Sequence, residues 1–183
     1  SPAFHPGGSS IALTLSIDGN PEIYLVNLDG SGKTRVTNSW ATDTSPSFSP
    51  NGRFMAFCSS RAGNPNIFLM DLRTSSVKRL SYEGKYNTEP VFSPKGDLVA
   101  FSHLGKDGRY RIAVVRPDGS GFRVLNGTGR GDESPTFSPD GRLIAFASSD
   151  GNIYITDLTG DVVIPVTTGG GYSEPAWSGV LTR

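Results

Sequence analysis

One phrase recurs five times along this 183-residue chain, and it constrains the fold more than any other feature. Its full form is Ser or Glu, Pro, any residue, Phe, Ser, Pro, any residue, Gly. The copies begin at Ser1, Ser45, Glu89, Ser134 and Glu174, so successive copies lie 40 to 45 residues apart. A repeat of this length indicates a chain assembled from similar supersecondary units.

Each unit reads as four short strands separated by turns. In the second unit the expected strands are 46–49, 53–60, 66–72 and 77–80, and Pro50-Asn51-Gly52 supplies the first turn. Proline presets φ and Asn-Gly tolerates positive φ, which suits a tight reversal of the chain. Four antiparallel strands in about 44 residues are typical of a β-propeller blade. A β-sandwich is the runner-up, but it would not repeat one phrase at a nearly fixed step.

The composition supports an all-β chain in one partial propeller domain. The 23 glycines and 13 prolines leave little room for long helices, and the runs between them are rich in β-branched and aromatic residues. We predict repeats at 1–44, 45–88, 89–133 and 134–173, followed by a closing strand at 174–183 that is the innermost strand of a fifth unit. The first aromatic residues of the copies should fill equivalent positions between blades: Phe4, Phe48, Phe92, Phe137 and Trp177.

The fifth copy suggests a piece of a larger ring. Its strand has no second, third and fourth strand of its own, and the first unit already owns an innermost strand. We expect further blades upstream, and an open ring would expose two apolar blade faces. Self-association through those faces is therefore expected.

Charge and apolar runs exclude several classes of function. Lys plus Arg and Asp plus Glu both number 17, so no net field favours nucleic acid. No run approaches the 18 or more apolar residues of a membrane helix, and residues 1–10 do not resemble a signal peptide. A single cysteine, Cys58, excludes an internal disulfide and occupies a slot for small residues in the repeat.

Polar residues ahead of the innermost strands predict a binding site. Connections before the first strand and between the second and third strands open on one face of a propeller, around its central channel. The residues expected at this mouth are Asp43, Thr44, Ser45, Thr88, Glu89, Asp132, Glu133, Ser134, Tyr172, Ser173 and Glu174, together with Asn87. As single residues, acids before proline serve to cap turns. As a ring they predict an acidic rim that captures a partner protein through its amides and cationic side chains.

Catalytic and metal chemistry have weaker support. The two histidines, His5 and His103, stand where other units have serine, and no Gly-x-Ser-x-Gly elbow is present, so we expect no catalytic residues. No compact Asp-rich loop supplies the six to eight oxygens that Ca²⁺ requires. We expect no cofactor or metal, and Ca²⁺ held by the carboxylates of the central channel is the alternative.

The repeat resembles that of the TolB family. The resemblance rests on the recurring phrase, on Asn66-Ile67-Phe68-Leu69 and Asn152-Ile153-Tyr154-Ile155 in the third strands, and on the ending Glu174-Pro175-Ala176-Trp177-Ser178. It implies a six-bladed ring, an α/β domain upstream, a periplasmic location and no enzymatic activity. It also implies docking of the lipoprotein Pal at the channel mouth within the Tol-Pal envelope system. Gly179-Val180-Leu181 departs from the family's usual end.

Two other interpretations stay open at the level of sequence. Similar repeats occur in propellers that gate prolyl-oligopeptidase-like hydrolases, although only a short tail follows Trp177. A propeller that binds a small sugar or peptide ligand is the third reading. Neither nucleic acid binding nor membrane insertion is expected under any of them.

Overall fold

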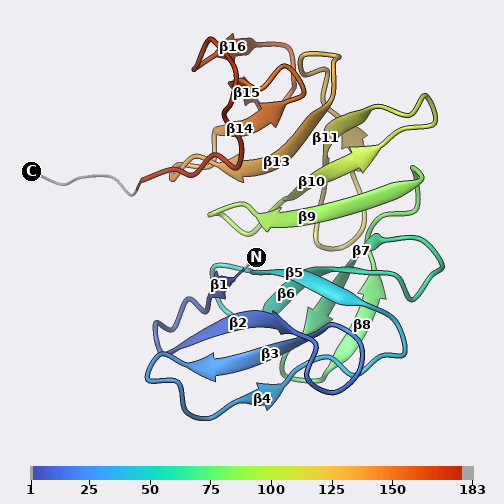
Figure 1. Cartoon of the computed structure of the whole chain (residues 1–183), viewed down its shortest axis with the longest axis vertical. Coiled ribbons are helices and arrows are strands. Elements are labelled where there is room, and N and C mark those ends of the chain that lie inside the picture. The colour runs from blue at the N-terminus through green and yellow to red at the C-terminus, as the bar shows by residue number, and fades with distance from the viewer. Residues whose placement is uncertain (1, 179–183) are drawn as a thin grey trace, which may run out of the picture.

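The computed structural model describes residues 2–178 as four antiparallel sheets with no helix among them. Each sheet contains four strands that are consecutive in the chain, in the order β1-β2-β3-β4, β5-β6-β7-β8, β9-β10-β11-β12 and β13-β14-β15-β16. The sheets succeed one another along the molecule from the N-terminus to the C-terminus (Figure 1). The predicted β-propeller is therefore confirmed, with four blades in the described part of the chain.

The strands are short, as the dense turn residues predict. Blade 1 contains β1 (Ala3–Phe4), β2 (Ser10–Leu15), β3 (Glu22–Asn27) and β4 (Thr34–Arg35); blade 2 contains β5 (Asp43–Phe48), β6 (Phe54–Ser59), β7 (Asn66–Asp71) and β8 (Ser76–Arg79); blade 3 contains β9 (Tyr86–Phe92), β10 (Val99–Leu104), β11 (Tyr110–Val115) and β12 (Arg123–Val124); blade 4 contains β13 (Asp132–Phe137), β14 (Leu143–Ser148), β15 (Ile153–Asp157) and β16 (Val163–Pro165). None of the residues 2–178 belongs to a helix that could cross a membrane.

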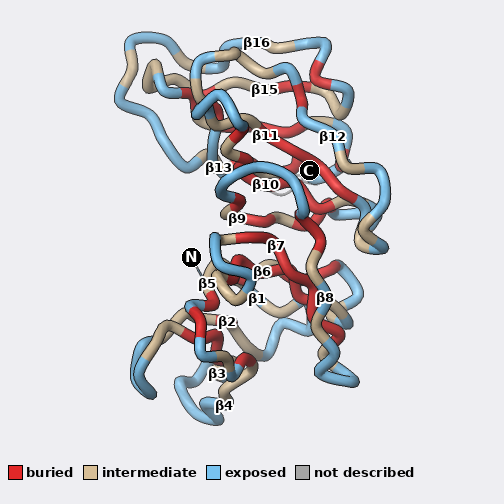
Figure 2. The backbone as a smooth tube through the Cα atoms, turned by 90° about the vertical axis from the view of Figure 1, so that its right-hand side faces the viewer, coloured by how far each residue is buried: buried red, intermediate tan, exposed pale blue. Residues whose placement is uncertain are grey.

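The apolar core lies between the blades. Three clusters of buried residues form, one at each junction of neighbouring sheets. Phe48, Phe92 and Phe137 each contribute to the cluster shared with the preceding blade, and each is less than 10% exposed. Buried backbone concentrates along this central stack of sheets (Figure 2). The aromatic residue of the repeated phrase therefore acts as the inter-blade contact, as the repeat predicts.

The first and last copies of the phrase differ from the internal ones. Phe4 is 69% exposed and Trp177 is 36% exposed, so neither reaches the burial of its internal counterparts. Val166 and Ile164 on the last blade are also about half exposed. Phe4 lacks a preceding blade to contact within residues 2–178, which explains its exposure. The equivalence that we predicted for all five aromatic residues is correct only for the internal three.

The predicted closing strand lies partly outside the described residues, since residues 179–183 are not among them. Residues 174–178 have no strand assignment. In the other units the innermost strand pairs with the second strand of its own unit, as β5 pairs with β6, and residues 2–178 hold no such partner for this segment. Trp177 nevertheless donates a hydrogen bond from Nε1 to the carbonyl of Thr136, at 3.2 Å.

Glycine in the turn between the first two strands serves the packing of neighbouring blades. Gly96 has φ of 74°, and a Cβ there would lie 3.2 Å from Cδ of Pro50 in the preceding blade. Gly141 has φ of 68°, and a Cβ there would lie 3.1 Å from Cγ of Pro94. Positive φ and close approach both favour glycine at this point of the phrase.

Candidate binding site at the channel mouth

A bulge interrupts each internal innermost strand at the proline of the phrase. The register between strands shifts between Thr44 and Ser47, and corresponding shifts occur in blades 3 and 4. Proline has no N–H to donate to a ladder, and a bulge tolerates that loss. The residue before the proline has positive φ in the second to fifth copies of the phrase: 53° at Ser45, 54° at Glu89, 54° at Ser134 and 51° at Glu174. Non-glycine residues seldom adopt such φ values, and they concentrate at functional sites.

These strained residues line one concavity, which we call the channel pocket. Its volume is about 190 Å³, and its walls are Ser45, Glu89, Ser134 and Glu174, the prolines that follow them, and Val91. Glu89 is fixed there, since its Oε2 accepts hydrogen bonds from Ser102 Oγ at 2.9 Å and from the Ser134 N–H at 3.0 Å. Four of the residues predicted for the mouth therefore line one concavity.

Asp43 and Asp132 have a different environment from the one that the sequence predicts. Both residues lie inside the innermost strands, and both are fully buried. Asp43 pairs with Arg61 at 2.6 Å, and Asp132 accepts hydrogen bonds from the N–H and the hydroxyl of Thr128. Burial raises the pKa of Asp43, partly offset by Ser59 and Arg61. These two acids secure the blade edges, so they are not accessible rim residues.

The other predicted mouth residues keep some contact with solvent. Thr44 and Thr88 are half-buried, whereas Glu133, Tyr172, Ser173 and Glu174 are exposed. Asn87, by contrast, is fully buried and bonds to Asn66 and His103. The rim is thus a subset of the predicted ring, concentrated on blades 3 and 4.

A second concavity, which we call the side pocket, opens between blades 3 and 4. Its volume is about 400 Å³. It is lined by Gly108, Arg109, Tyr110, Arg130, Gly131, Glu133, Ser134, Ala147, Ser148, Ser149, Tyr172 and Ser173. Ser134 also lines the channel pocket, so the two concavities adjoin. Only Glu133, Ser134, Tyr172 and Ser173 of this lining were predicted.

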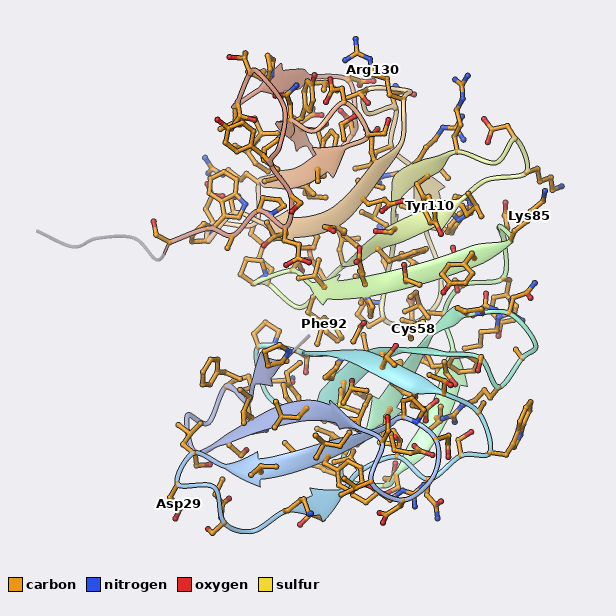
Figure 3. All side chains as sticks on the ribbon, in the orientation of Figure 1. Asp29, Cys58, Lys85, Phe92, Tyr110 and Arg130 are labelled. Atoms are coloured by element: carbon orange, nitrogen blue, oxygen red, sulfur yellow. The ribbon has the colours of Figure 1, made fainter. Side chains whose placement is uncertain are left out.

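Basic side chains share the mouth with the acids, which corrects the predicted acidic rim. Lys85, Lys106, Arg109 and Arg130 are exposed, and all four lie in connections that open at this end. Figure 3 labels Lys85, Tyr110 and Arg130 at one end of the blades and Asp29 at the opposite end. The basic residues at the mouth could have been predicted from the sequence, because they fall in the same connections as the acids. The prediction considered only the acids before proline. The mouth has mixed charge.

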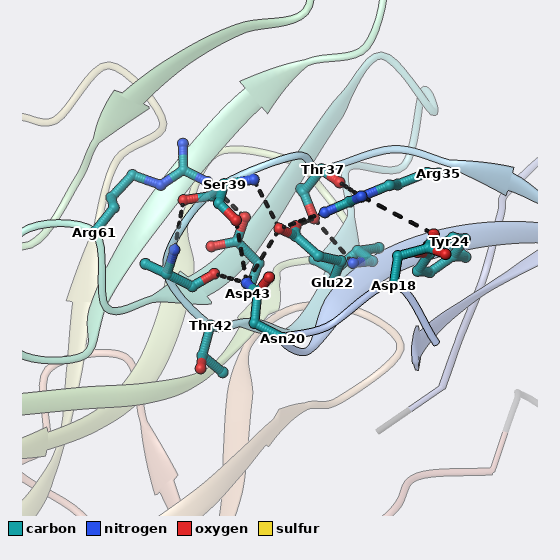
Figure 4. A network of polar contacts seen from close by, with 12 residues as sticks. Asp18, Asn20, Glu22, Tyr24, Arg35, Thr37, Ser39, Thr42, Asp43 and Arg61 are labelled. Carbon is teal, nitrogen blue, oxygen red and sulfur yellow. Dashed lines mark hydrogen bonds and ion pairs between the residues drawn. The ribbon is translucent and has the colours of Figure 1, made fainter. Parts of the chain in front are cut away.

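Polar networks close the first junction beneath this face. Glu22 is fully buried, and its carboxylate accepts hydrogen bonds from Thr37 Oγ1 at 2.5 Å, the Ser39 N–H at 2.7 Å and Arg35 at 3.0 Å (Figure 4). Burial disfavours ionisation of Glu22, but these bonds outweigh it and lower the pKa. Asn20 donates to the carbonyl oxygens of Ser39 and Ala41 in the same network.

The candidate reactive groups are engaged in the structure. Cys58 is buried, and burial raises the pKa of its thiol to about 11. His103 is 5% exposed and bonds through Nδ1 to Asn87 Oδ1 at 2.8 Å, so it is part of a buried polar network. His5 accepts the Gly7 N–H within its turn, at 3.1 Å. No group of three or more His, Cys, Asp or Glu side chains in residues 2–178 is arranged to hold a metal ion.

Comparisons with solved structures place these features in a known architecture. TolB from Acinetobacter baumannii is similar with a TM-score of 0.82 and 30% sequence identity, over 94% of this chain and 44% of that one. A putative TolB from Agrobacterium tumefaciens is similar with a TM-score of 0.83 and 27% identity, over 97% of this chain and 69% of that one. The chain thus spans less than half of the Acinetobacter protein.

A more distant structure and the family comparison complete the picture. A chain in a nidogen/laminin complex is similar in fold, with a TM-score of 0.78 and 14% identity, over 96% of this chain and 66% of that one. No curated protein sequence matches. The model of the TolB beta propeller domain, PD40, matches residues 1–181. The chain therefore belongs to the TolB β-propeller family.

Proposed function

We propose that this chain is a non-enzymatic docking module of the TolB type that binds the lipoprotein Pal at its channel mouth, in the periplasm, as part of the Tol-Pal envelope system. The observation that carries the proposal is the convergence of the strained residues before proline on one concavity. Ser45, Glu89, Ser134 and Glu174 all combine positive φ with a place in this concavity, and backbone strain of this kind concentrates at functional sites. Membership of the TolB family supports Pal as the partner.

The surface around the mouth suits a protein partner. Trp40, Tyr82 and Tyr172 are 81%, 71% and 48% exposed, and each lies in a connection that opens at this end. Tyrosine, tryptophan and arginine are the residues most enriched in the energetically dominant parts of protein interfaces. Exposed charges of both signs surround them, and such charges set orientation and association rate more than affinity.

Titration of the soluble domain of Pal into the full chain tests this function. We expect saturable binding by calorimetry. Tyr172→Ala should weaken it, because this exposed ring borders the side pocket. Arg142→Ala is the matched control, since Arg142 is exposed on a turn at the opposite end and forms only a 3.8 Å pair with Asp140.

The pattern across the two variants decides the result. Binding that falls with Tyr172→Ala and persists with Arg142→Ala supports docking at the mouth. No heat of binding with the unaltered chain contradicts the proposed partner, and equal loss in both variants contradicts the proposed surface.

A further inference from the structure

The side pocket contains one charged group that the fold leaves without a partner. No hydrogen bond or ion pair to the Glu133 carboxylate comes from any of residues 2–178, although the residue lines a concavity of about 400 Å³. Glu133 as a whole is exposed, but desolvation of its carboxylate by the surrounding protein, together with the negative charge of nearby Glu89, raises the pKa of Glu133. Both causes disfavour the charged form of the carboxylate, and the attraction of a positive charge beside it would offset them.

The neighbouring acid shows that this situation is specific to Glu133. Successive residues of a strand point to opposite faces, so Asp132 and Glu133 of β13 meet different surroundings. Asp132 is fully buried and accepts two hydrogen bonds from Thr128, at 2.9 and 2.5 Å. The fold therefore satisfies one acid of the pair and presents the other to the side pocket.

The two arginines of the side pocket already have acceptors of their own. Arg130 bonds through Nη1 to Asp150 Oδ2 at 2.5 Å, and Arg109 bonds through Nη1 to the carbonyl of Gly129 at 3.1 Å. The Arg130 pair compensates that positive charge within blade 4. The Arg109 contact holds its guanidinium against the loop that precedes β13. Neither arginine bonds to Glu133 in the described residues.

Two aromatic rings complete a site for a positively charged group. Tyr110 and Tyr172 both line the side pocket, and Tyr172 is 48% exposed. The face of a tyrosine ring attracts a cation within about 6 Å of its centre. A carboxylate beside aromatic rings is suited to a guanidinium or an ammonium on an apolar stem, because the stem contacts the rings while the head pairs with the acid.

We infer that the side pocket receives a lysine or arginine side chain of the docking protein, with Glu133 as its ion-pair partner. The inference rests on the proposed docking function, because the side pocket adjoins the channel pocket at Ser134 and a protein seated on the mouth covers both. Glu133 is then the residue that selects for a basic side chain at this point of the interface.

The test uses small probes and the full chain. Nα-acetyl-arginine N-methylamide is titrated while amide chemical shifts are followed by NMR, alongside the matching derivatives of glutamine and glutamate. We expect shifts at Gly131, Ser149 and Ser173 with the arginine probe alone. Glu133→Gln should weaken that binding about tenfold or more, the size expected for one charge-assisted contact. Glu83→Gln is the matched control, because Glu83 is an exposed acid on the connection before β9 and does not line the side pocket.

The outcomes separate this inference from the proposed function. Unchanged arginine binding in Glu133→Gln, or a preference for the glutamate probe, overturns the inference. A second arm repeats the titration with the soluble domain of Pal. Loss of Pal affinity in Glu133→Gln but not in Glu83→Gln supports the inference, and equal Pal affinity in both overturns it. If Pal fails to bind the unaltered chain, the proposed function fails, while the arginine probe still decides the chemistry of the side pocket.

Discussion

The first and third blade junctions are built from the same repeat, but the hydrogen bonds that link their connections at the mouth differ. At the first, the short side chain of Asn20 bonds to the carbonyl oxygens of Ser39 and Ala41, and the Asp43 N–H donates to the carbonyl of Pro21 at 2.9 Å. At the third, the tie between the corresponding segments is the long side chain of Arg109. The short Asn20 side chain can bond only when the two connections lie close together. The longer Arg109 side chain bonds across a wider separation, and the side pocket lies in that space.

Small departures from the repeat in blade 3 account for this difference. Thr37, Ser81 and Thr167 each accept a backbone N–H from the third strand of their blade, at 2.8 to 2.9 Å. Asn126 holds the equivalent position in blade 3 and makes no such bond in the described residues. The connection between β10 and β11, residues 105–109, is also one residue shorter than the connection between β6 and β7, residues 60–65. The repeat determines the four blades, and the departure of blade 3 from the repeat forms the side pocket.

The largest effect on stability should come from removing an aromatic side chain that is buried between two blades. Phe92→Ala should lower the free energy of unfolding by about 3 to 5 kcal/mol, because Phe92 is 6% exposed and the cavity cannot fully collapse. Phe4→Ala removes the same group from the same place in the phrase, but Phe4 is 69% exposed, so its cost should stay below about 0.5 kcal/mol. Urea denaturation of both variants measures the contrast. Equal costs would mean that the terminal and internal copies do not differ in packing.

The rate of cysteine modification should differ between the closed second junction and the side pocket at the third junction. With a pKa of about 11, only about one thiol in a thousand of Cys58 is ionised at pH 8, and the side chain is buried. Iodoacetamide should therefore modify native Cys58 at least about 100-fold more slowly than the urea-unfolded chain. Ser149→Cys in a Cys58→Ser background places the thiol on an exposed residue of the side pocket, where it should react at nearly the unfolded rate. Rapid labelling of native Cys58 would indicate that the second junction opens.

Adjacent acids of β13 should differ in what they contribute to stability. Asp132→Ala should cost about 1 to 3 kcal/mol, because it removes a fully buried carboxylate and leaves the half-buried Thr128 N–H without its acceptor. Glu133→Ala should stay within about 0.5 kcal/mol, since no group in residues 2–178 bonds to its carboxylate. Thermal unfolding of the two variants provides the measurement. A comparable loss from Glu133→Ala would show that this acid is structural.

The smallest effect concerns pH at the second junction. Burial lowers the pKa of His103 below its usual 6.5, and Arg111 adds to this, while Glu83 and Asp107 oppose it. A base with a depressed pKa binds its proton more readily in the unfolded chain, so stability should be full above pH 6.5 and decline as pH falls below it. His103→Gln should flatten this decline between pH 7 and 5. Denaturant titrations at a series of pH values measure this. If stability changes with pH equally in both proteins, other groups cause the pH dependence.

Sequence reasoning reached the architecture because the repeat encodes it directly. The spacing of the proline phrase predicts the blades, and Phe48, Phe92 and Phe137 occupy the positions that the phrase assigns to them. The terminal copies could not be predicted in the same way, because burial of Phe4 depends on a neighbouring blade and not on Phe4 itself. The local motif determines where in the blade the aromatic side chain lies, whereas the neighbouring blade determines whether that side chain is buried.

The candidate site was only half predictable for the same reason. Ser45, Glu89, Ser134 and Glu174 follow from their place before proline, where each has positive φ and lines the channel pocket. Asp43 and Asp132 occupy equally suggestive positions, but Asp43 pairs with Arg61 across the blade and Asp132 bonds to Thr128 in the connection before β13, and the repeated phrase includes neither partner. The side pocket depends on a changed connection between β10 and β11 and on the hydrogen bond that Asn126 does not make in blade 3, and no single motif predicts either.

Hydrogen–deuterium exchange with the soluble domain of Pal tests most directly the claim that the mouth between blades 3 and 4 is the docking site. We predict slower exchange at residues 105–110, 129–134 and 170–173 when Pal is added, with residues 50–53, 95–97 and 140–142 at the opposite end unchanged. Protection at the opposite end, or none at the mouth under saturating Pal, would contradict the account.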